Sequence, residues 1–285
     1  MYENDGASDP TWTKTTIDSY IPGYFVELAD IDSDGDLDIV SASKNPYGTT
    51  TYIDWYENDG AATWTPAFTA ADINISANVA RDLHIADMDR DGDLDIVSAS
   101  SGDNTIAWYE NDGAANPSWT ASDISYTALG PRGIFLADID SDGDLDIISA
   151  SSGDNTIAWY ENDGAANPSW TASDISYTAL GPRGIFLADI DSDGDLDIIS
   201  ASSGDNTIAW YENDGNSDPS WTAADISTTA DGARNVFVAD IDSDGDLDIV
   251  SASHDDDTIA WYENDGNSDP SFTKNVISTS ADGAR

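Results

Sequence analysis

Cysteine is absent from the 285-residue sequence, and basic residues are scarce. Without cysteine the chain has no disulfide bonds, no thiolate zinc sites and no cysteine nucleophile. Lys and Arg number 9 against 56 Asp and Glu, which gives a formal net charge of −47. This balance argues against nucleic acid and anionic membranes as partners, because both are recognised through clustered Lys and Arg.

Long apolar runs are missing as well. None approaches the roughly 18 residues of a membrane-spanning helix, so we expect no membrane insertion. Residues 1–6 lack the charged and apolar regions of a signal peptide. Strong acidity is typical of disordered chains, but 10 Trp, 12 Tyr and 6 Phe predict a chain that folds once its carboxylates are neutralised.

A repeat of about 51 residues runs through the whole sequence. Residues 98–164 recur unchanged as residues 149–215. The string Tyr-Glu-Asn-Asp-Gly starts at Tyr2, Tyr56, Tyr109, Tyr160, Tyr211 and Tyr262. No linker interrupts the array, so we expect a single repeat domain over residues 1–285. Its units cover approximately residues 2–55, 56–108, 109–159, 160–210 and 211–261, with a partial unit at 262–285.

Each unit carries the signals of four short strands and no helical periodicity. In the middle of the chain, apolar or β-branched runs cover residues 134–137, 145–151 and 156–160, and a more polar run covers 169–176. Turn-forming residues separate these runs. The pattern predicts an all-β fold, a β-propeller of four-stranded antiparallel blades, with five blades. A parallel β-helix fits less well because its coils are shorter, and separate β-sandwiches need more strands per unit.

An acidic loop, D-x-D-x-D-G-x-x-D, lies between the first and second predicted strands of each unit. It occurs five times and holds 25 of the 56 acidic residues. We number its positions one to nine, with glycine at position six and aspartate at positions one, three, five, seven and nine. The aspartates of the five copies are Asp30, Asp32, Asp34, Asp36 and Asp38; Asp87, Asp89, Asp91, Asp93 and Asp95; Asp138, Asp140, Asp142, Asp144 and Asp146; Asp189, Asp191, Asp193, Asp195 and Asp197; and Asp240, Asp242, Asp244, Asp246 and Asp248.

Alternate aspartates converge when such a loop curls around a cation, and the glycine permits the sharp turn. Hard oxygen ligands favour Ca²⁺ or Mg²⁺ over zinc or copper, and five or more oxygens from a flexible loop favour Ca²⁺. We expect side-chain ligands at positions one, three, five and nine, and a backbone carbonyl ligand at position seven. An ordinary acidic turn is the alternative for one copy, but five complete copies argue against it. Five bound Ca²⁺ ions would change the net charge from −47 to −37.

At these loops the sequence resembles the FG-GAP/VCBS repeat family of integrin-like β-propellers. The matching strings are ADIDSDGDLDIVSAS at residues 29–43, ADMDRDGDLDIVSAS at residues 86–100, and three later copies. The resemblance implies calcium in the hairpin that joins the first two strands of each blade, and an extracellular or cell-surface protein. Two features depart from the family. The phenylalanine-glycine element is weak, and only five loops occur whereas many members have seven blades.

Each unit also carries two tryptophans. One lies on the third predicted strand, at Trp55, Trp108, Trp159, Trp210 and Trp261. The other opens the fourth, at Trp12, Trp64, Trp119, Trp170 and Trp221, with Phe272 in the last copy. We expect most of them to pack between blades. The alternative is a lectin, in which the tryptophans stack on glycans bound between blades.

The remaining polar residues give weaker signals. An arginine precedes the first strand in most units, and we expect it to pair with an acidic group rather than to bind an anion amid such negative potential. His84 replaces a repeated phenylalanine, which we interpret as drift. A catalytic site needs residues that break the repeat, and the sequence shows no such cluster. We therefore predict that the protein is not an enzyme. A glycan-cleaving enzyme is the third alternative, after the structural module and the lectin.

The two ends of the chain hold a surplus copy of the fourth strand, at residues 11–18 or 271–278. We expect one terminal copy to complete the blade at the other end, and we expect head-to-tail self-association through terminal strands. Altogether the sequence predicts a calcium-binding propeller, with about five Ca²⁺ ions, that acts as an extracellular structural, adhesion or self-assembly module. Its expected partners are a protein or a glycan at the cell surface.

Overall fold

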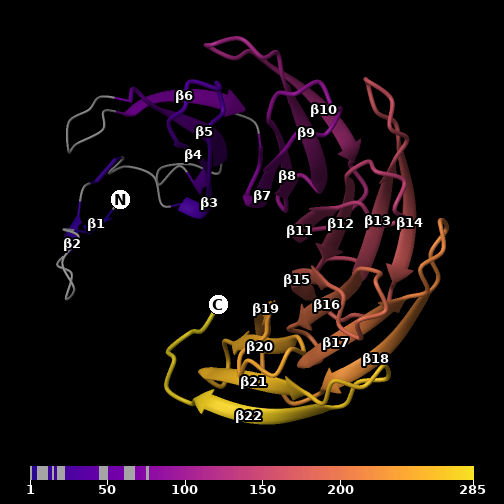
Figure 1. Ribbon diagram of the computed structural model, residues 1–285. Helices are drawn as coiled ribbons and strands as arrows, with labels where there is room; N and C mark the ends of the chain where they lie inside the picture. The colour runs from indigo at the N-terminus through magenta and orange to yellow at the C-terminus, as the bar shows by residue number, and fades with distance from the viewer. Residues whose placement is uncertain are drawn as a thin grey trace.

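A computed structural model describes residues 2–4, 12–14, 16–17, 23–44, 51–60, 68–74 and 77–285. The regular structure in these residues is entirely β. Five four-stranded antiparallel sheets follow one another along the chain, and each uses four consecutive strands in order (Figure 1). The predicted all-β fold of four-stranded antiparallel blades is therefore confirmed.

The bounds of the strands show the repeat. The first sheet comprises β3 (Gly23–Ala29), β4 (Asp38–Lys44), β5 (Thr51–Asn58) and β6 (Phe68–Asn74). The second comprises β7 (Ala80–Ala86), β8 (Asp95–Ser100), β9 (Thr105–Asn111) and β10 (Trp119–Ser125). The third comprises β11 (Pro131–Ala137), β12 (Asp146–Ser151), β13 (Thr156–Asn162) and β14 (Trp170–Ser176). The fourth comprises β15 (Pro182–Ala188), β16 (Asp197–Ser202), β17 (Thr207–Asn213) and β18 (Trp221–Ser227). The fifth comprises β19 (Ala233–Ala239), β20 (Asp248–Ser253), β21 (Thr258–Asn264) and β22 (Phe272–Ser278).

The four strands predicted in the middle of the chain correspond to β11–β14. The second strand of this sheet is buried along its whole length, whereas the fourth strand is mostly exposed. This difference explains the sequence pattern, because the second strand has neighbours on both faces and both edges, while the fourth forms the outer edge of its blade.

The hydrophobic core is divided into clusters that lie between neighbouring sheets. One cluster joins Ile148 and Trp159 of the third sheet to Ile185 and Ile198 of the fourth. Corresponding clusters join the first sheet to the second, the second to the third, and the fourth to the fifth. Each blade is therefore stabilised mainly by burial against the blades beside it, as expected for a repeat fold.

The first strand of each sheet lies nearest the centre of the molecule (Figure 1). Consecutive inner strands are in contact, from β3 to β7 and onward to β19. Phe135 of β11 lies against Phe186 of β15, with ring centroids 5.3 Å apart. Because equivalent residues are neighbours, the inner strands run in the same direction. The five acidic loops, which follow these strands, therefore share one end of the propeller.

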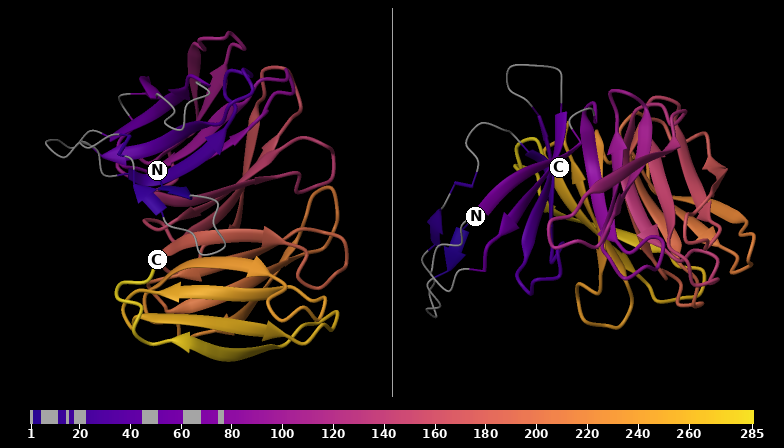
Figure 2. Two further views of the ribbon diagram at one scale, coloured as in Figure 1. Left: turned by 60° about the vertical axis from the view of Figure 1, so that its left-hand side comes forward. Right: turned by 90° about the horizontal axis from the view of Figure 1, so that it is seen from above.

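The sheets form an open arc rather than a closed ring, with the opening between the first and fifth sheets (Figures 1 and 2). The strand β22 pairs with β21 and so completes its own sheet. At the other end, β1 (Tyr2–Asn4) and β2 (Trp12–Lys14) form a separate two-stranded sheet. The prediction that a terminal copy completes the blade at the opposite end is therefore wrong for this structure.

The repeated tryptophans behave mostly as packing residues. Trp55, Trp108, Trp159 and Trp210 are 2–5% exposed. On the fourth strands, the half-buried Trp119, Trp170, Trp221 and Phe272 pack against the clusters between sheets. Trp64 lies outside the described residues, and so does the side chain of Trp12.

Candidate functional site

The acidic loops have one backbone conformation that is repeated five times. Position four adopts a left-handed conformation, with φ between 58° and 67°, although it is serine or arginine. The glycine at position six has φ between 97° and 105° in every copy. In the first loop, a Cβ added to Gly35 would meet no atom within 4 Å, so this glycine is required by its backbone angle and not by lack of space.

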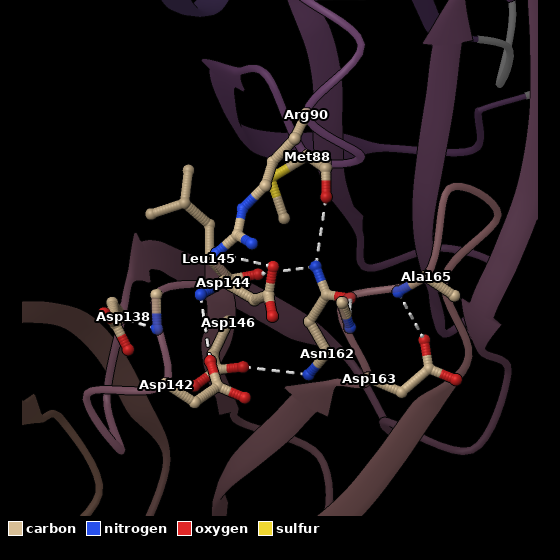
Figure 3. Close-up of polar contacts among 12 residues, drawn as sticks. Met88, Arg90, Asp138, Asp142, Asp144, Leu145, Asp146, Asn162, Asp163 and Ala165 are labelled. Carbon is tan, nitrogen blue, oxygen red and sulfur yellow. Dashed lines mark hydrogen bonds and ion pairs between the residues drawn. The ribbon is translucent and has the colours of Figure 1, made fainter.

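The aspartate at position nine anchors each loop to the blade. In the third loop Asp146 is 1% exposed, and its two carboxylate oxygens accept hydrogen bonds from the N–H groups of Ile139, at 3.2 Å, and Asn162, at 2.8 Å. Ile139 stands at position two, and Asn162 ends the third strand (Figure 3 shows the second contact). The same two bonds occur in the other four loops.

The aspartates at positions one and three converge in all five loops. Together with a third aspartate, each pair brings three carboxylate oxygens within 4.8 Å of one another. The third member stands at position five in three loops and at position nine in two. The groups are Asp30, Asp32 and Asp34; Asp87, Asp89 and Asp95; Asp138, Asp140 and Asp142; Asp189, Asp191 and Asp193; and Asp240, Asp242 and Asp248.

Hydrogen bonds from the loop backbone hold these carboxylates in place. In the third loop, the N–H groups of Asp142, Gly143 and Asp144 donate to the carboxylates of Asp140, Asp138 and Asp142, at 2.9–3.3 Å. Some oxygens stay unsatisfied. The Oδ1 atoms of Asp87 and Asp138 are buried and accept no hydrogen bond. A buried carboxylate oxygen without a donor is costly, so these atoms fit a cation ligand.

The electrostatics of the loops point the same way. At position three, burial and then repulsion by neighbouring aspartates raise the pKa of Asp32. Burial is also the largest cause that raises the pKa of Asp89, Asp140, Asp191 and Asp242. At position nine, burial raises the pKa of Asp95, Asp146 and Asp197 to about 7. The fold therefore disfavours the ionised form of these particular carboxylates unless positive charge is supplied.

Position seven has a different surrounding from the other aspartates. A Cβ added to Gly164 would overlap the carboxylate of Asp144, and the same holds for the glycine of the other Tyr-Glu-Asn-Asp-Gly strings beside position seven. Asp144 also forms an ion pair with Arg90 of the preceding loop, at 2.7 Å (Figure 3). The side chain at position seven thus contacts the neighbouring turn and, in this copy, the neighbouring blade.

The asparagine of the Tyr-Glu-Asn-Asp-Gly string is a residue that the sequence reasoning missed. The Nδ2 atom of the buried Asn162 donates to the carbonyl of Leu145, in its own loop, at 3.1 Å and to that of Met88, in the preceding loop, at 3.0 Å (Figure 3). Asn111, Asn213 and Asn264 make the equivalent pair of bonds. This asparagine therefore ties each loop to the previous one. Its recurrence in every string was the available signal.

The tryptophans of the third strands lie beside the acidic loops. The Nε1 atom of Trp55 donates to Asp38 Oδ2 at 3.0 Å. In the next three blades, side-chain hydrogen bonding by Trp108, Trp159 and Trp210 lowers the pKa of Asp95, Asp146 and Asp197, against the larger effect of burial.

A polar cluster that breaks the repeat lies on the first two inner strands. His84 stands between Phe25 and Phe135, with ring centroids 5.9 and 5.7 Å away. Its Nδ1 atom is 3.7 Å from Glu27 Oε2. Burial lowers the pKa of His84 and raises that of Glu27 to about 7. The interpretation of His84 as drift overlooked this neighbour, because Glu27 and His84 are brought together only by contact between blades.

Comparison with known proteins identifies the repeat. The FG-GAP-like repeat family matches residues 30–98, 87–149, 138–200 and 189–251. No curated protein matches the chain. The chain is similar in fold to the periplasmic gluconolactonase PpgL of Pseudomonas aeruginosa, with a TM-score of 0.55, 13% identity, and coverage of 89% of this chain and 70% of that one. A second structure with a provisional gluconolactonase name has a TM-score of 0.46 and 13% identity, and covers 90% of this chain and 81% of that one.

Proposed function

The chain belongs to the FG-GAP-like repeat family, and on that premise we propose that it is a calcium-loaded β-propeller that serves as an extracellular structural or adhesion module. One observation carries the calcium proposal: each of the five loops gathers three carboxylate oxygens within 4.8 Å. The buried, unsatisfied oxygens of Asp87 and Asp138 support it. All of these donors are hard oxygens, and oxygens are the ligands that calcium prefers.

The aspartates at different positions of each loop have different proposed roles. Positions one and three hold the ion together with position five or position nine, and position nine also fixes the loop to the third strand. Calcium supplies the positive charge that offsets repulsion among these carboxylates. Because an ion bound only to the folded state adds to its stability, the proposed role of the metal is to stabilise the first hairpin of each blade.

Terbium luminescence tests this proposal directly. Tb³⁺ is a hard cation that takes oxygen ligands as calcium does, and Trp55 lies beside Asp38 at a distance that permits energy transfer. We expect sensitised emission that added calcium displaces. The paired substitutions Asp138→Asn and Asp140→Asn should remove one binding equivalent, whereas Asp163→Asn, in an exposed turn outside the loops, should remove none. Equal stoichiometry in all three proteins would refute the site.

The proposed partners are a protein or a glycan at the cell surface and a second copy of the chain. The two-stranded sheet of β1 and β2 supports self-association, because it stands apart from the five blades. Comparing the size in solution of the full chain with that of a chain lacking residues 1–20 tests this point, and an unchanged monomer in both cases would exclude it. Binding of glycans to an array in calcium would favour a lectin over the structural role.

A lactone-hydrolysing enzyme is the second candidate function. Glu27 and His84 form a pair at 3.7 Å that the other blades do not repeat, and the similar structure of PpgL carries the name of a gluconolactonase. The variant His84→Phe restores the residue found in three other blades, so it should fold. Hydrolysis of gluconolactone by the native chain, lost in this variant, would establish the enzyme, and no hydrolysis by the native chain would exclude it.

A further inference from the structure

Five of the six arginines of the sequence gather at the centre of the propeller. Arg81, Arg132, Arg183 and Arg234 each stand one residue after the start of an inner strand. With Arg285 they line a cavity of about 250 Å³ to which Tyr24, Phe25 and Asp82 also contribute. Because the acidic loops follow these strands, the cavity lies at the opposite end of the propeller from the loops.

Serine side chains hold the arginines in a common orientation. The Nε atoms of Arg81, Arg132 and Arg183 donate to the Oγ atoms of three equivalent serines at 3.2, 2.8 and 2.7 Å. These serines, which are Ser101, Ser152 and Ser203, donate in turn to backbone carbonyls. The terminal amino groups of these guanidiniums have no acceptor among the described residues. They are the donors that remain for a ligand.

The arginines also lack acidic partners. Among the described residues no carboxylate lies within 4.0 Å of Arg81, Arg132, Arg183 or Arg234, whereas Arg90 in an acidic loop pairs with Asp144 at 2.7 Å. The expectation that these arginines pair with acidic groups is therefore wrong. In the fifth blade His254 replaces the serine, and the Nε atom of Arg234 is buried without a hydrogen-bond partner.

The guanidiniums are close enough to repel one another. Burial, and then the charge of neighbouring arginines, lowers the pKa of Arg183 to about 10 and also lowers that of Arg132. Two glycines allow this approach, because a Cβ on Gly133 would collide with the carbonyl of Arg183 and a Cβ on Gly184 with Asn235. Like charges crowded without partners are costly unless an anion shares them.

Two carboxylates act on this region. Asp82 lines the cavity, and the pKa of Asp255 is lowered first by its hydrogen bond with His254 and then by the charges of His254, Arg234 and Arg183. Asp82 accepts hydrogen bonds from the N–H groups of Leu83 and Ile134, and burial raises its pKa to about 7. Asp255 pairs with His254 at 2.7 Å. Since Asp82 is the acidic residue among the described lining residues, against five arginines, the lining keeps a net positive charge in a protein of net charge −47.

We propose that this arginine-lined cavity binds a small multivalent oxyanion, such as sulfate, phosphate or a compact di- or tricarboxylate. Guanidinium groups bind such oxyanions through paired, charge-assisted hydrogen bonds. The cavity volume suits a small molecule, and the surrounding acidic surface repels larger polyanions. This site is independent of the calcium proposed for the loops.

Sulfate is the suitable probe, because phosphate and citrate would also compete for calcium. The experiment follows the arginine Nε–Hε signals of the calcium-saturated chain by NMR during titration with sulfate, at constant ionic strength set by chloride. We expect saturable shifts of Arg132 and Arg183, with Arg90 unmoved. The double variant Arg132→Gln/Arg183→Gln should weaken sulfate binding at least about tenfold, since each lost charge-assisted bond is worth that much. Arg90→Gln should leave binding unchanged.

Two results would overturn the proposal. The first is a lack of saturable arginine shifts in the native chain at millimolar sulfate, which does not depend on any variant folding. The second is equal affinity in the double variant and in Arg90→Gln. Loss of calcium binding in a loop variant with retained sulfate binding would count against the loop proposal alone.

Discussion

The two ends of most inner strands carry opposite charge. At the end of each strand, five aspartates crowd into a nine-residue loop, while at the start four of the five strands carry an arginine without an acidic partner and β3 carries Tyr24. The loop draws its ligands from one repeat, whereas the arginine-lined cavity draws residues from all five blades. A site built within a repeat is multiplied by repetition, but a site on the axis is formed once by all repeats together.

The comparison predicts that the acidic end depends on metal for its stability. Removing calcium with excess EGTA should lower Tm by about 10 °C or more, because several ions bound only to the folded state each contribute about 2.7 kcal/mol when present at a hundred times their Kd. Calorimetry at constant ionic strength measures the shift. Magnesium at the same concentration serves as the control and should restore less. An unchanged Tm in EGTA would mean that the carboxylates need no cation.

The asparagines that link the loops give the next largest effect. Asn162→Ala should destabilise the protein by about 2–4 kcal/mol, since it leaves the carbonyls of Met88 and Leu145 without their buried donor. The matched control is Asn58→Ala, because Asn58 Nδ2 has one described acceptor, Leu37 O. Denaturant unfolding should show the smaller loss for this control. Equal losses of stability in the two variants would show that the hydrogen bond from Asn162 to the preceding loop does not stabilise the protein.

Acidification should act in opposite directions with and without calcium. The pKa of Asp95, Asp146 and Asp197 is raised in the fold to about 7 from an ordinary 3.8. Between these two pKa values the folded state binds more protons than the unfolded chain. Without metal, the free energy of unfolding therefore falls as the pH rises through this range. The loss is at most about 1.4 kcal/mol per group and pH unit. In EGTA we therefore expect Tm to rise by several degrees when the pH is lowered from about 7.5 to about 5.5.

In saturating calcium the slope should reverse, because protons compete with the ion for the same carboxylates. Melting curves at matched ionic strength with and without calcium measure both slopes. Parallel slopes in the two conditions would contradict a shared set of carboxylates.

The smallest change in stability is expected for a substitution on the inner strands, which lie nearest the axis. His84→Phe should change the free energy of unfolding by less than about 1 kcal/mol, because phenylalanine at this position in the next three blades packs at ring-centroid distances of 5.0–5.3 Å. The control Phe135→Ala should cost about 3 kcal/mol or more. Urea unfolding of both variants checks the ranking, and a large loss for His84→Phe would show that the contact with Glu27 supports the fold.

The sequence predicts what lies within one repeat. The strands near residues 134–137 and 169–176 and the convergence of Asp138 and Asp140 follow from local spacing, and the structure has them there. It could not predict contacts that require neighbouring blades. Asn162 reaches Met88 across 74 residues, and Arg132 approaches Arg183 only because the inner strands lie side by side. The pair of Glu27 and His84 was likewise not predictable, because the two residues belong to different units and meet only through contact between two blades.

Native mass spectrometry of the calcium-saturated chain is the most direct test of the central claim, since it counts ions on the folded molecule. The account predicts five bound calcium ions in the compact charge states, and four after Asp138→Asn and Asp140→Asn are introduced together. A compact molecule that carries no calcium would contradict it.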